Sequence, residues 1–290
     1  MTDNPADWIL PVTDPLATAG APWLPGKVAL VAGGGLSGPE GGVGFAMAWL
    51  YAKNGAAIAV LDRDEAAGMR TVTAVRDLGV EAEFFAVDVT SDDSVAAAVE
   101  AVVARFGRID IVADSIGGTG AEPMFETTPE RFQFAMDLNF TQAWYVLRHA
   151  QKHMTSGGSI VTISSGAAEG RGPGMAYSFA KTALEKLTVG AAGSLAPRGI
   201  RVNCVRVGMI WGAFAARGMT EEQRKTRAEN VALGVEGNNW DIASAAFFLT
   251  TDQARWISGQ VVTVDGGGFK PRNLGAAGSR PQDLGAEKSA

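Results

Sequence analysis

The sequence predicts an α/β protein in which helices cover both faces of one doubly wound, parallel sheet of about seven strands. Short apolar, β-branched runs alternate with helix-like segments along most of the chain, as expected when helices connect parallel strands. A glycine-rich turn follows the first apolar run, and a Ser-Ser pair ends a later one. Because such sheets bind ligands at the ends of their strands, both features also indicate a site.

Length and composition fit a single domain. A chain of 290 residues with 47% hydrophobic residues can bury a sizeable core. The net charge of −6 argues against a nucleic-acid surface. Cys204 is the single cysteine and stands in an apolar run, which fits a buried structural thiol and a reducing compartment. With no run of about 18 apolar residues and no secretory signal at the N-terminus, a cytoplasmic location is expected.

The chain is expected to divide into three segments. Residues 1–25 read as an arm, either loosely ordered or packed on its own or another subunit's surface. Residues 26–268 form the folded domain, and residues 269–290, rich in Gly, Ala and Lys, form a flexible tail.

The elements of the domain follow from the apolar pattern. Strands are expected at 27–32, 56–61, 83–87, 108–113, 159–165, 199–205 and 259–264. Helices are expected at 45–53, from an N-cap at Ser91 to 105, and at 131–154, 175–197 and 240–249.

The glycine-rich turn predicts a nucleotide site. It runs from Gly33 to Gly42-Val43-Gly44, between the first strand and the first helix. Strand, glycine-rich turn and helix are the context that a Rossmann-type dinucleotide-binding unit requires, because glycines let a pyrophosphate approach a helix N-terminus. The alternative, a surface loop unrelated to phosphate, is disfavoured by these flanking elements.

Asp62 predicts the choice of dinucleotide. It ends the second strand, where a carboxylate accepts hydrogen bonds from the ribose hydroxyls and repels a 2′-phosphate. The residue therefore favours NAD over NADP, although Arg63 directly after it could weaken that discrimination.

The segment from Ser159 to Lys181 carries the chemistry. Ser164 and Ser165 end a strand, and Tyr177 and Lys181 lie four residues apart on one face of the following helix. A free tyrosine, with a pKa of about 10, is a poor base near neutrality, and a nearby ammonium lowers that value. Tyr177 could then transfer a hydroxyl proton while a serine hydroxyl binds the substrate oxygen.

These motifs resemble the short-chain dehydrogenase/reductase family. The strand with its serines, Tyr177-Ser-Phe-Ala-Lys181 and the later Val264-Asp-Gly-Gly carry the resemblance, which runs from about Lys27 to Gly268. It implies a catalytic set of Asn, Ser, Tyr and Lys, here Asn139, Ser165, Tyr177 and Lys181. The resemblance also implies cofactor contacts at Asp88 and Val89 against the adenine, and at Gly117, Tyr177, Lys181 and Gly208.

The chain departs from the family pattern at four places. Eight residues separate Gly33 from Gly42, an insertion of five relative to the family. Asp114-Ser115 replaces a pair of asparagines that supports the central sheet, and we expect the two residues to substitute for it. Val207 replaces a proline before Gly208, and Gly212 replaces a threonine that contacts the nicotinamide amide.

The catalytic serine is ambiguous in the sequence. Ser164 has the common spacing of thirteen residues to Tyr177, whereas strand register points to Ser165. We favour Ser165, with one residue deleted from the following loop. Glu169 and Arg171 in that loop could reach substrate, but solvated surface charges are the simpler interpretation.

The substrate region and the histidines are less informative. Met209, Trp211, Phe214 and Met219 suggest an apolar pocket, but core packing explains them equally well. His149 and His153, spaced i,i+4, lack further ligands at an obvious spacing, so no metal site is expected.

The sequence thus predicts an NAD-dependent oxidoreductase acting on a secondary alcohol or its ketone, and the apolar residues of the substrate region point to a hydrophobic or aromatic substrate. The alternatives are an NADP-dependent carbonyl reductase and a nucleotide-binding regulatory protein that has lost catalysis. The family resemblance implies a homotetramer that pairs through helices at 124–154 and 175–197.

Overall fold

The computed structural model describes residues 22–268, except residues 40, 119–121, 124, 171–173, 213–214 and 216–218. Most of the predicted arm, the tail, Arg171 and Phe214 therefore lie outside the described residues. At the end of the arm Leu24 is buried, and its amide donates to the carbonyl of Asn54 at 2.8 Å, so this part of the arm packs on its own domain.

A seven-stranded parallel sheet confirms the predicted fold class. Its strands are β1 (Val28–Ala32), β2 (Ala57–Asp62), β3 (Ala82–Ala86), β4 (Ile109–Asp114), β5 (Met154–Ser165), β6 (Arg201–Val207) and β9 (Val261–Val264). They are ordered β3-β2-β1-β4-β5-β6-β9, and every neighbouring pair is parallel. The chain changes direction across the sheet between β1 and β4, which is where such sheets bind ligands.

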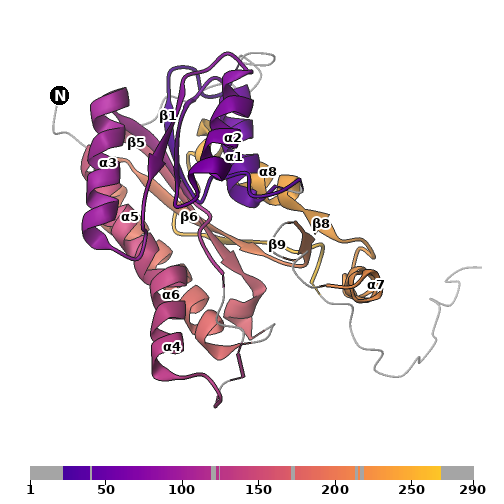
Figure 1. Cartoon of the computed structure of the whole chain (residues 1–290). Coiled ribbons are helices and arrows are strands. Elements are labelled where there is room, and N and C mark those ends of the chain that lie inside the picture. The colour runs from indigo at the N-terminus through magenta and orange to yellow at the C-terminus, as the bar shows by residue number, and fades with distance from the viewer. Residues whose placement is uncertain are drawn as a thin grey trace, which may run out of the picture.

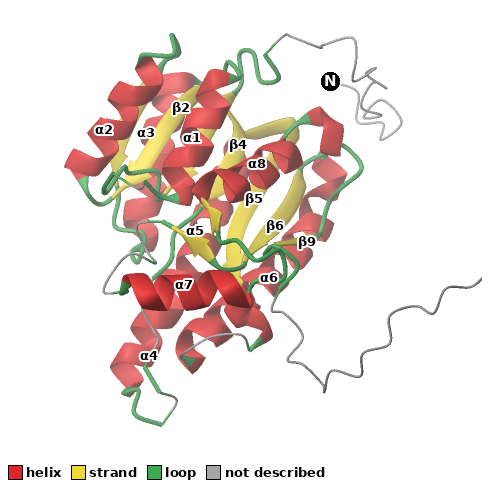
Figure 2. Ribbon diagram, turned by 90° about the vertical axis from the view of Figure 1, so that its right-hand side faces the viewer, coloured by secondary structure: helices red, strands yellow, loops and turns green. Residues whose placement is uncertain are grey.

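Helices cover both faces of this sheet (Figure 1). One face carries α1 (Val43–Lys53), α2 (Glu65–Arg76) and α8 (Asn239–Thr250). The other face carries α3 (Asp92–Phe106), α5 (Gln142–Ala150) and α6 (Met175–Leu195). Figure 2 shows α4 (Pro129–Met136) and α7 (Glu221–Asn230) beyond one end of the sheet. The short strands β7 (Ile210–Trp211) and β8 (Gly237–Asn238) pair separately in a two-stranded sheet.

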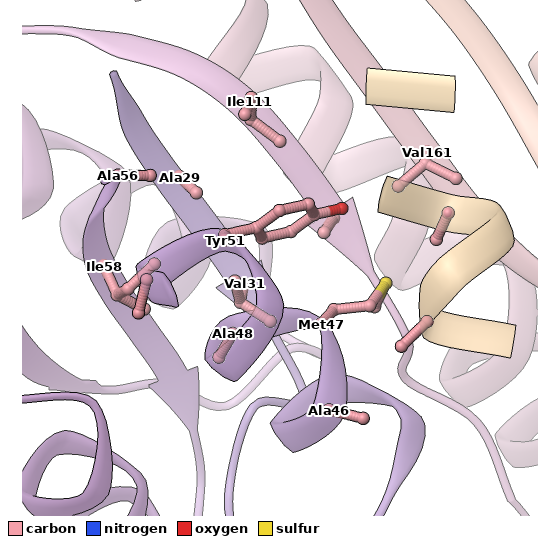
Figure 3. Close-up of a cluster of buried hydrophobic side chains, with 14 of the residues drawn as sticks. Ala29, Val31, Ala46, Met47, Ala48, Tyr51, Ala56, Ile58, Ile111 and Val161 are labelled. Carbon is pink, nitrogen blue, oxygen red and sulfur yellow. The ribbon is translucent and has the colours of Figure 1, made fainter. Parts of the chain in front are cut away.

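Each face of the sheet has its own hydrophobic core. In β1 all five residues are buried, because Ala29 and Val31 face α1 whereas Leu30 and Ala32 face the opposite layer. Figure 3 shows Tyr51 of α1 inside the first core, with its ring fully enclosed. Burial raises the pKa of this tyrosine well above its usual range.

Several predicted elements need correction. The helix expected at 131–154 is divided by a π-helical turn at Asp137–Thr141, and Met154 already belongs to β5. Helices α2 and α7 and the pair β7–β8 were not expected. The predicted N-cap is confirmed, since the Ser91 hydroxyl accepts from the amide of Ser94. Among the described helices, none has the length and apolar character needed to cross a membrane.

Candidate active site

The glycine-rich turn after β1 has no room for side chains at Gly33 and Gly44. Gly33 has a φ of +73°, and its amide donates to the carbonyl of Leu61 at 2.8 Å. A Cβ placed on Gly44 would lie 2.1 Å from the Gly33 carbonyl oxygen. Gly42 is the N-cap of α1, which begins at Val43, and no side chain caps this helix. The turn therefore offers free backbone amides at a helix N-terminus, the arrangement that binds phosphate.

The inserted part of this loop is anchored at both ends. Near its start, the Thr71 hydroxyl of α2 donates to the carbonyl of Gly34 at 2.7 Å. Arg70 Nε, also from α2, donates to the carbonyl of Leu36 at 2.8 Å. Near its end, Asn239 Nδ2 from α8 donates to the carbonyl of Gly41 at 3.1 Å. The insertion thus bridges α2 and α8.

Asp62 lies directly beside the same loop. Its Oδ2 accepts from the amide of Gly35 at 2.9 Å, and its Oδ1 accepts from the amide of Asp64 at 3.1 Å. A Cβ on Gly35 would lie only 2.6 Å from Oδ2. Since an ionised carboxylate offers about four acceptor positions, two remain open to further donors.

Asp88 and Val89 follow β3 at the same end of the sheet. Asp88 is exposed, and its Oδ1 accepts from the hydroxyl of Thr90 at 2.6 Å and from the amide of Thr90 at 3.0 Å. These hydrogen bonds from Thr90 lower the pKa of Asp88. Val89 packs against the core on the α3 side.

Lys181 is buried beneath Tyr177 on α6. Its side chain is only 2% exposed, and Nζ lies 5.8 Å from the centre of the Tyr177 ring. Nζ donates to the carbonyls of Ile163 at 2.9 Å and Ile116 at 3.3 Å. These carbonyls hold the ammonium at the ends of β4 and β5, next to the tyrosine.

Gly117 lets Asn139 and Lys181 come together. A Cβ on Gly117 would lie 3.0 Å from both Asn139 Oδ1 and Lys181 Nζ. Asn139 is fully buried inside the π-helical turn, where its Nδ2 donates to the carbonyl of Gly118 at 2.7 Å. The amide of Gly118 donates back to Asn139 Oδ1 at 2.8 Å. The asparagine therefore fixes the segment that follows β4 beside the lysine.

The two serines at the end of β5 have different surroundings. Ser164 is buried, and its hydroxyl donates to Glu185 Oε1 at 2.8 Å. Glu185 in turn accepts two hydrogen bonds from Arg206, which also pairs with Glu169. Ser165 is half-buried and lines a pocket of about 90 Å³. The other described residues of this pocket are Gly166, Val207, Gly208, Met209, Val231, Thr263, Asp265 and Gly268.

Gly208 and Gly212 both leave room for a neighbouring side chain. A Cβ on Gly208 would lie 2.3 Å from the Cβ of Asp265. A Cβ on Gly212 would lie 2.5 Å from Oδ1 of Asn239, so the larger residue of the family pattern cannot fit there without movement. Asn239 is a site residue that the sequence analysis missed. In the sequence, only the unexpected glycine at 212 could have indicated Asn239. Its contact with Gly41 joins residues 198 positions apart and leaves no local pattern.

The two histidines and the cysteine contact residues outside the Tyr177–Lys181 site. His149 Nε2 lies 2.8 Å from Asp92, and His153 Nε2 lies 2.9 Å from Glu100. Within the described ranges, no three His, Cys, Asp or Glu side chains are grouped as a metal site would require. Cys204 is buried, as predicted, and burial raises its pKa to about 11.

The sheet, its glycine-rich turn and the Tyr-x-x-x-Lys pair define an α/β protein of the Rossmann type, and comparison with known proteins identifies its family. Residues 38–268 match the family described as enoyl-(acyl carrier protein) reductase. Momilactone A synthase of Oryza sativa subsp. japonica is 36% identical over 262 residues, covering 86% of this chain and 92% of the relative. The chain belongs to the short-chain dehydrogenase/reductase family.

Solved relatives include complexes with either nicotinamide cofactor. A short chain dehydrogenase of Burkholderia cenocepacia J2315 in complex with NADP has a TM-score of 0.78 and 29% identity, covering 84% of this chain and 98% of that one. A 7α-hydroxysteroid dehydrogenase complexed with NADH and a 7-oxo bile acid has a TM-score of 0.79 and 31% identity, covering 86% and 97%.

Proposed function

We propose that the protein is an NAD-dependent oxidoreductase that interconverts a secondary alcohol and its ketone. The observation that carries this proposal is the buried Lys181 ammonium, held by two carbonyls 5.8 Å from the Tyr177 ring. The uncapped N-terminus of α1 at Gly42 and the acceptor positions of Asp62 fit the pyrophosphate and ribose of a dinucleotide. A bound nicotinamide would accept or supply the hydride.

The protein's own side chains carry out the proton transfer of this reaction. Tyr177 takes the proton from the alcohol hydroxyl, or returns it to the ketone oxygen, and Lys181 stabilises the phenolate that this requires. The Ser165 hydroxyl donates to the same substrate oxygen and orients it. Asn139 lies in the π-helical turn and holds the backbone at Gly118, beside Lys181, through two hydrogen bonds.

The pocket beside Ser165 supports a hydrophobic substrate. Val207, Met209 and Val231 supply apolar walls, and the space of about 90 Å³ holds only part of a larger molecule. A bulky apolar alcohol that leaves part of its body outside fits this shape. The bile-acid ligand of the 7α-hydroxysteroid dehydrogenase relative supports the same class.

The cofactor choice tests the proposal directly. Secondary alcohols with apolar rings, a hydroxysteroid among them, should reduce NAD, and kcat/KM should favour NAD over NADP by at least about tenfold, or about 1.4 kcal/mol. The physical reason is repulsion between Asp62 and a 2′-phosphate in a partly desolvated site. The measurement is nicotinamide absorbance with each cofactor.

Asp62→Ser should shrink this preference, chiefly by improving the use of NADP. Asp77→Ser, which removes an exposed carboxylate from the far end of α2, is the matched control and should leave the preference unchanged. Equal or better use of NADP by the wild type would show that the inserted loop keeps the ribose away from Asp62, and would reject the assignment.

We also propose that the protein assembles as a homotetramer. Large apolar side chains are exposed on the helices where the family resemblance implies pairing, namely Phe132, Phe134, Trp144, Phe179 and Val189. Exposed apolar faces of this kind are typical of interfaces. Light scattering at micromolar concentration should report a tetramer for the wild type and a smaller species for Val189→Glu. Leu78→Glu, at an exposed position after α2, is the control, and a monomeric wild type would reject the proposal.

A further inference from the structure

A buried carboxyl group, that of Asp114, lies beside the proposed catalytic lysine. Asp114 ends β4 and is only 2% exposed. Its Oδ1 accepts from the amide of Ile116 at 3.0 Å, and its Oδ2 accepts from Gln142 Nε2 at 3.0 Å. Two N–H donors thus face the two oxygens, an arrangement that favours the ionised carboxylate.

Asp114 and Lys181 are coupled through one residue. Ile116 donates its amide to Asp114 and accepts Lys181 Nζ at its carbonyl, so the carboxylate shapes the turn that holds the ammonium. The lysine also attracts the carboxylate directly. Burial is the larger influence and raises the pKa of Asp114, whereas the Ile116 amide, Lys181 and Gln142 lower it.

Few other charged groups surround Asp114 and Lys181 in the described part of the chain. Tyr177 and Lys181 come from α6, and Cys204 from β6 is a neutral thiol near neutrality because burial raises its pKa to about 11. Glu185, further along α6, is paired with Arg206. The neighbours of Asp114 on β1 and β5 are the uncharged Ala32 and Thr162. Asp114 is therefore a buried carboxyl group beside Lys181, and the groups of Ile116 and Gln142 that donate to it are uncharged.

We propose that Asp114 is a positioning residue and counter-ion for Lys181, and that its negative charge shifts the ionisation of Tyr177 to higher pH. The sign follows from Coulomb's law. An anion beside Lys181 offsets part of the field that stabilises the phenolate, so the tyrosine holds its proton up to a higher pH than it would with an uncharged amide at position 114. The kinetic part of this inference rests on the proposed function.

Asp114→Asn tests the charge with little change of shape. The asparagine oxygen can still accept from Ile116, and its amide can face Gln142 Oε1, a buried atom without a hydrogen-bond partner in the described structure. The phenolate absorbance is measured without cofactor in the wild type and in Asp114→Asn. The absorbance of the same protein carrying Tyr177→Phe is subtracted, which leaves the titration of Tyr177. Its midpoint should fall by roughly half a unit to one unit in Asp114→Asn. Asp114→Ser serves as the second uncharged variant if the first does not fold.

The pH dependence of alcohol oxidation should show the same shift. Alcohol oxidation requires the phenolate, so its rate rises with pH through the ionisation of Tyr177. At a pH below that midpoint, Asp114→Asn should therefore be roughly three to ten times faster than the wild type in kcat/KM. The absorbance titration needs no turnover, so it still tests Asp114 if the wild type oxidises no alcohol.

Ser115→Ala is the matched control in the same turn. Its hydroxyl donates to the carbonyls of Ala32 at 3.0 Å and Gly33 at 3.2 Å, so the change alters hydrogen bonding without altering charge. The Tyr177 midpoint should stay at the wild-type value. An unchanged midpoint in Asp114→Asn would show that Asp114 is a neutral acid, and an equal shift in Ser115→Ala would assign the effect to backbone geometry. Either result overturns the proposal.

Discussion

Tyr177→Phe should lower kcat for alcohol oxidation by about a hundredfold to ten-thousandfold, the range observed when a positioned acid/base is lost. Phenylalanine keeps the ring over Lys181 but has no hydroxyl to exchange a proton with the substrate oxygen. The glycine-rich turn and Asp62 are untouched, so the dissociation constant of NAD should stay close to the wild-type value. Single-turnover kinetics and a fluorescence titration of NAD measure the two quantities separately.

Tyr145→Phe is the matched control for this experiment. Tyr145 lies on α5, where its ring contacts Trp144 rather than the Tyr177–Lys181 pair. The same chemical change there should leave both kcat and the affinity for NAD unaltered. Substantial turnover by Tyr177→Phe would reject the acid/base assignment, and loss of NAD binding together with turnover would point to a structural role.

The fold could be predicted because its signals are local. Each strand of a parallel sheet is buried on both faces, so it appears in the sequence as a short continuous apolar run such as Val28–Ala32. The glycine-rich turn and Tyr177 with Lys181 are likewise short-range patterns. Since each pattern follows the end of a strand, the sequence could place the turn and the Tyr–Lys pair at the same edge of the sheet.

The parts that were missed depend on contacts between distant segments. Asn239 reaches Gly41 across 198 positions, and Gln142 meets Asp114 across 28 positions. Helix α7 was overlooked because it is strongly polar and buries none of its residues, so it has no apolar stripe to detect. The insertion after Gly33 could be counted in the sequence, but its anchoring on α2 and α8 could not be seen there.

The roles of Ser164 and Ser165 should separate in two different measurements. Ser165 lines the pocket, so Ser165→Ala should remove a hydrogen bond that strengthens as charge develops on the substrate oxygen. Losses of one such donor lower kcat by about a hundredfold to a thousandfold. Because the Ser165 hydroxyl also accepts from the amide of Ala167 at 3.3 Å, a weak contact, the stability of the protein should change little.

Ser164→Ala should show the opposite pattern. Its hydroxyl donates to Glu185, which already holds Arg206 with both oxygens, and the alanine leaves a half-buried carboxylate with one donor fewer. A hydrogen bond to a charged group contributes about 1.5–3 kcal/mol, so the free energy of unfolding should fall by that order while kcat stays near the wild-type value. Denaturant unfolding and steady-state kinetics on both variants give the comparison. If Ser164→Ala instead costs more in kcat than Ser165→Ala, the thirteen-residue spacing to Tyr177 identifies the catalytic serine and strand register does not.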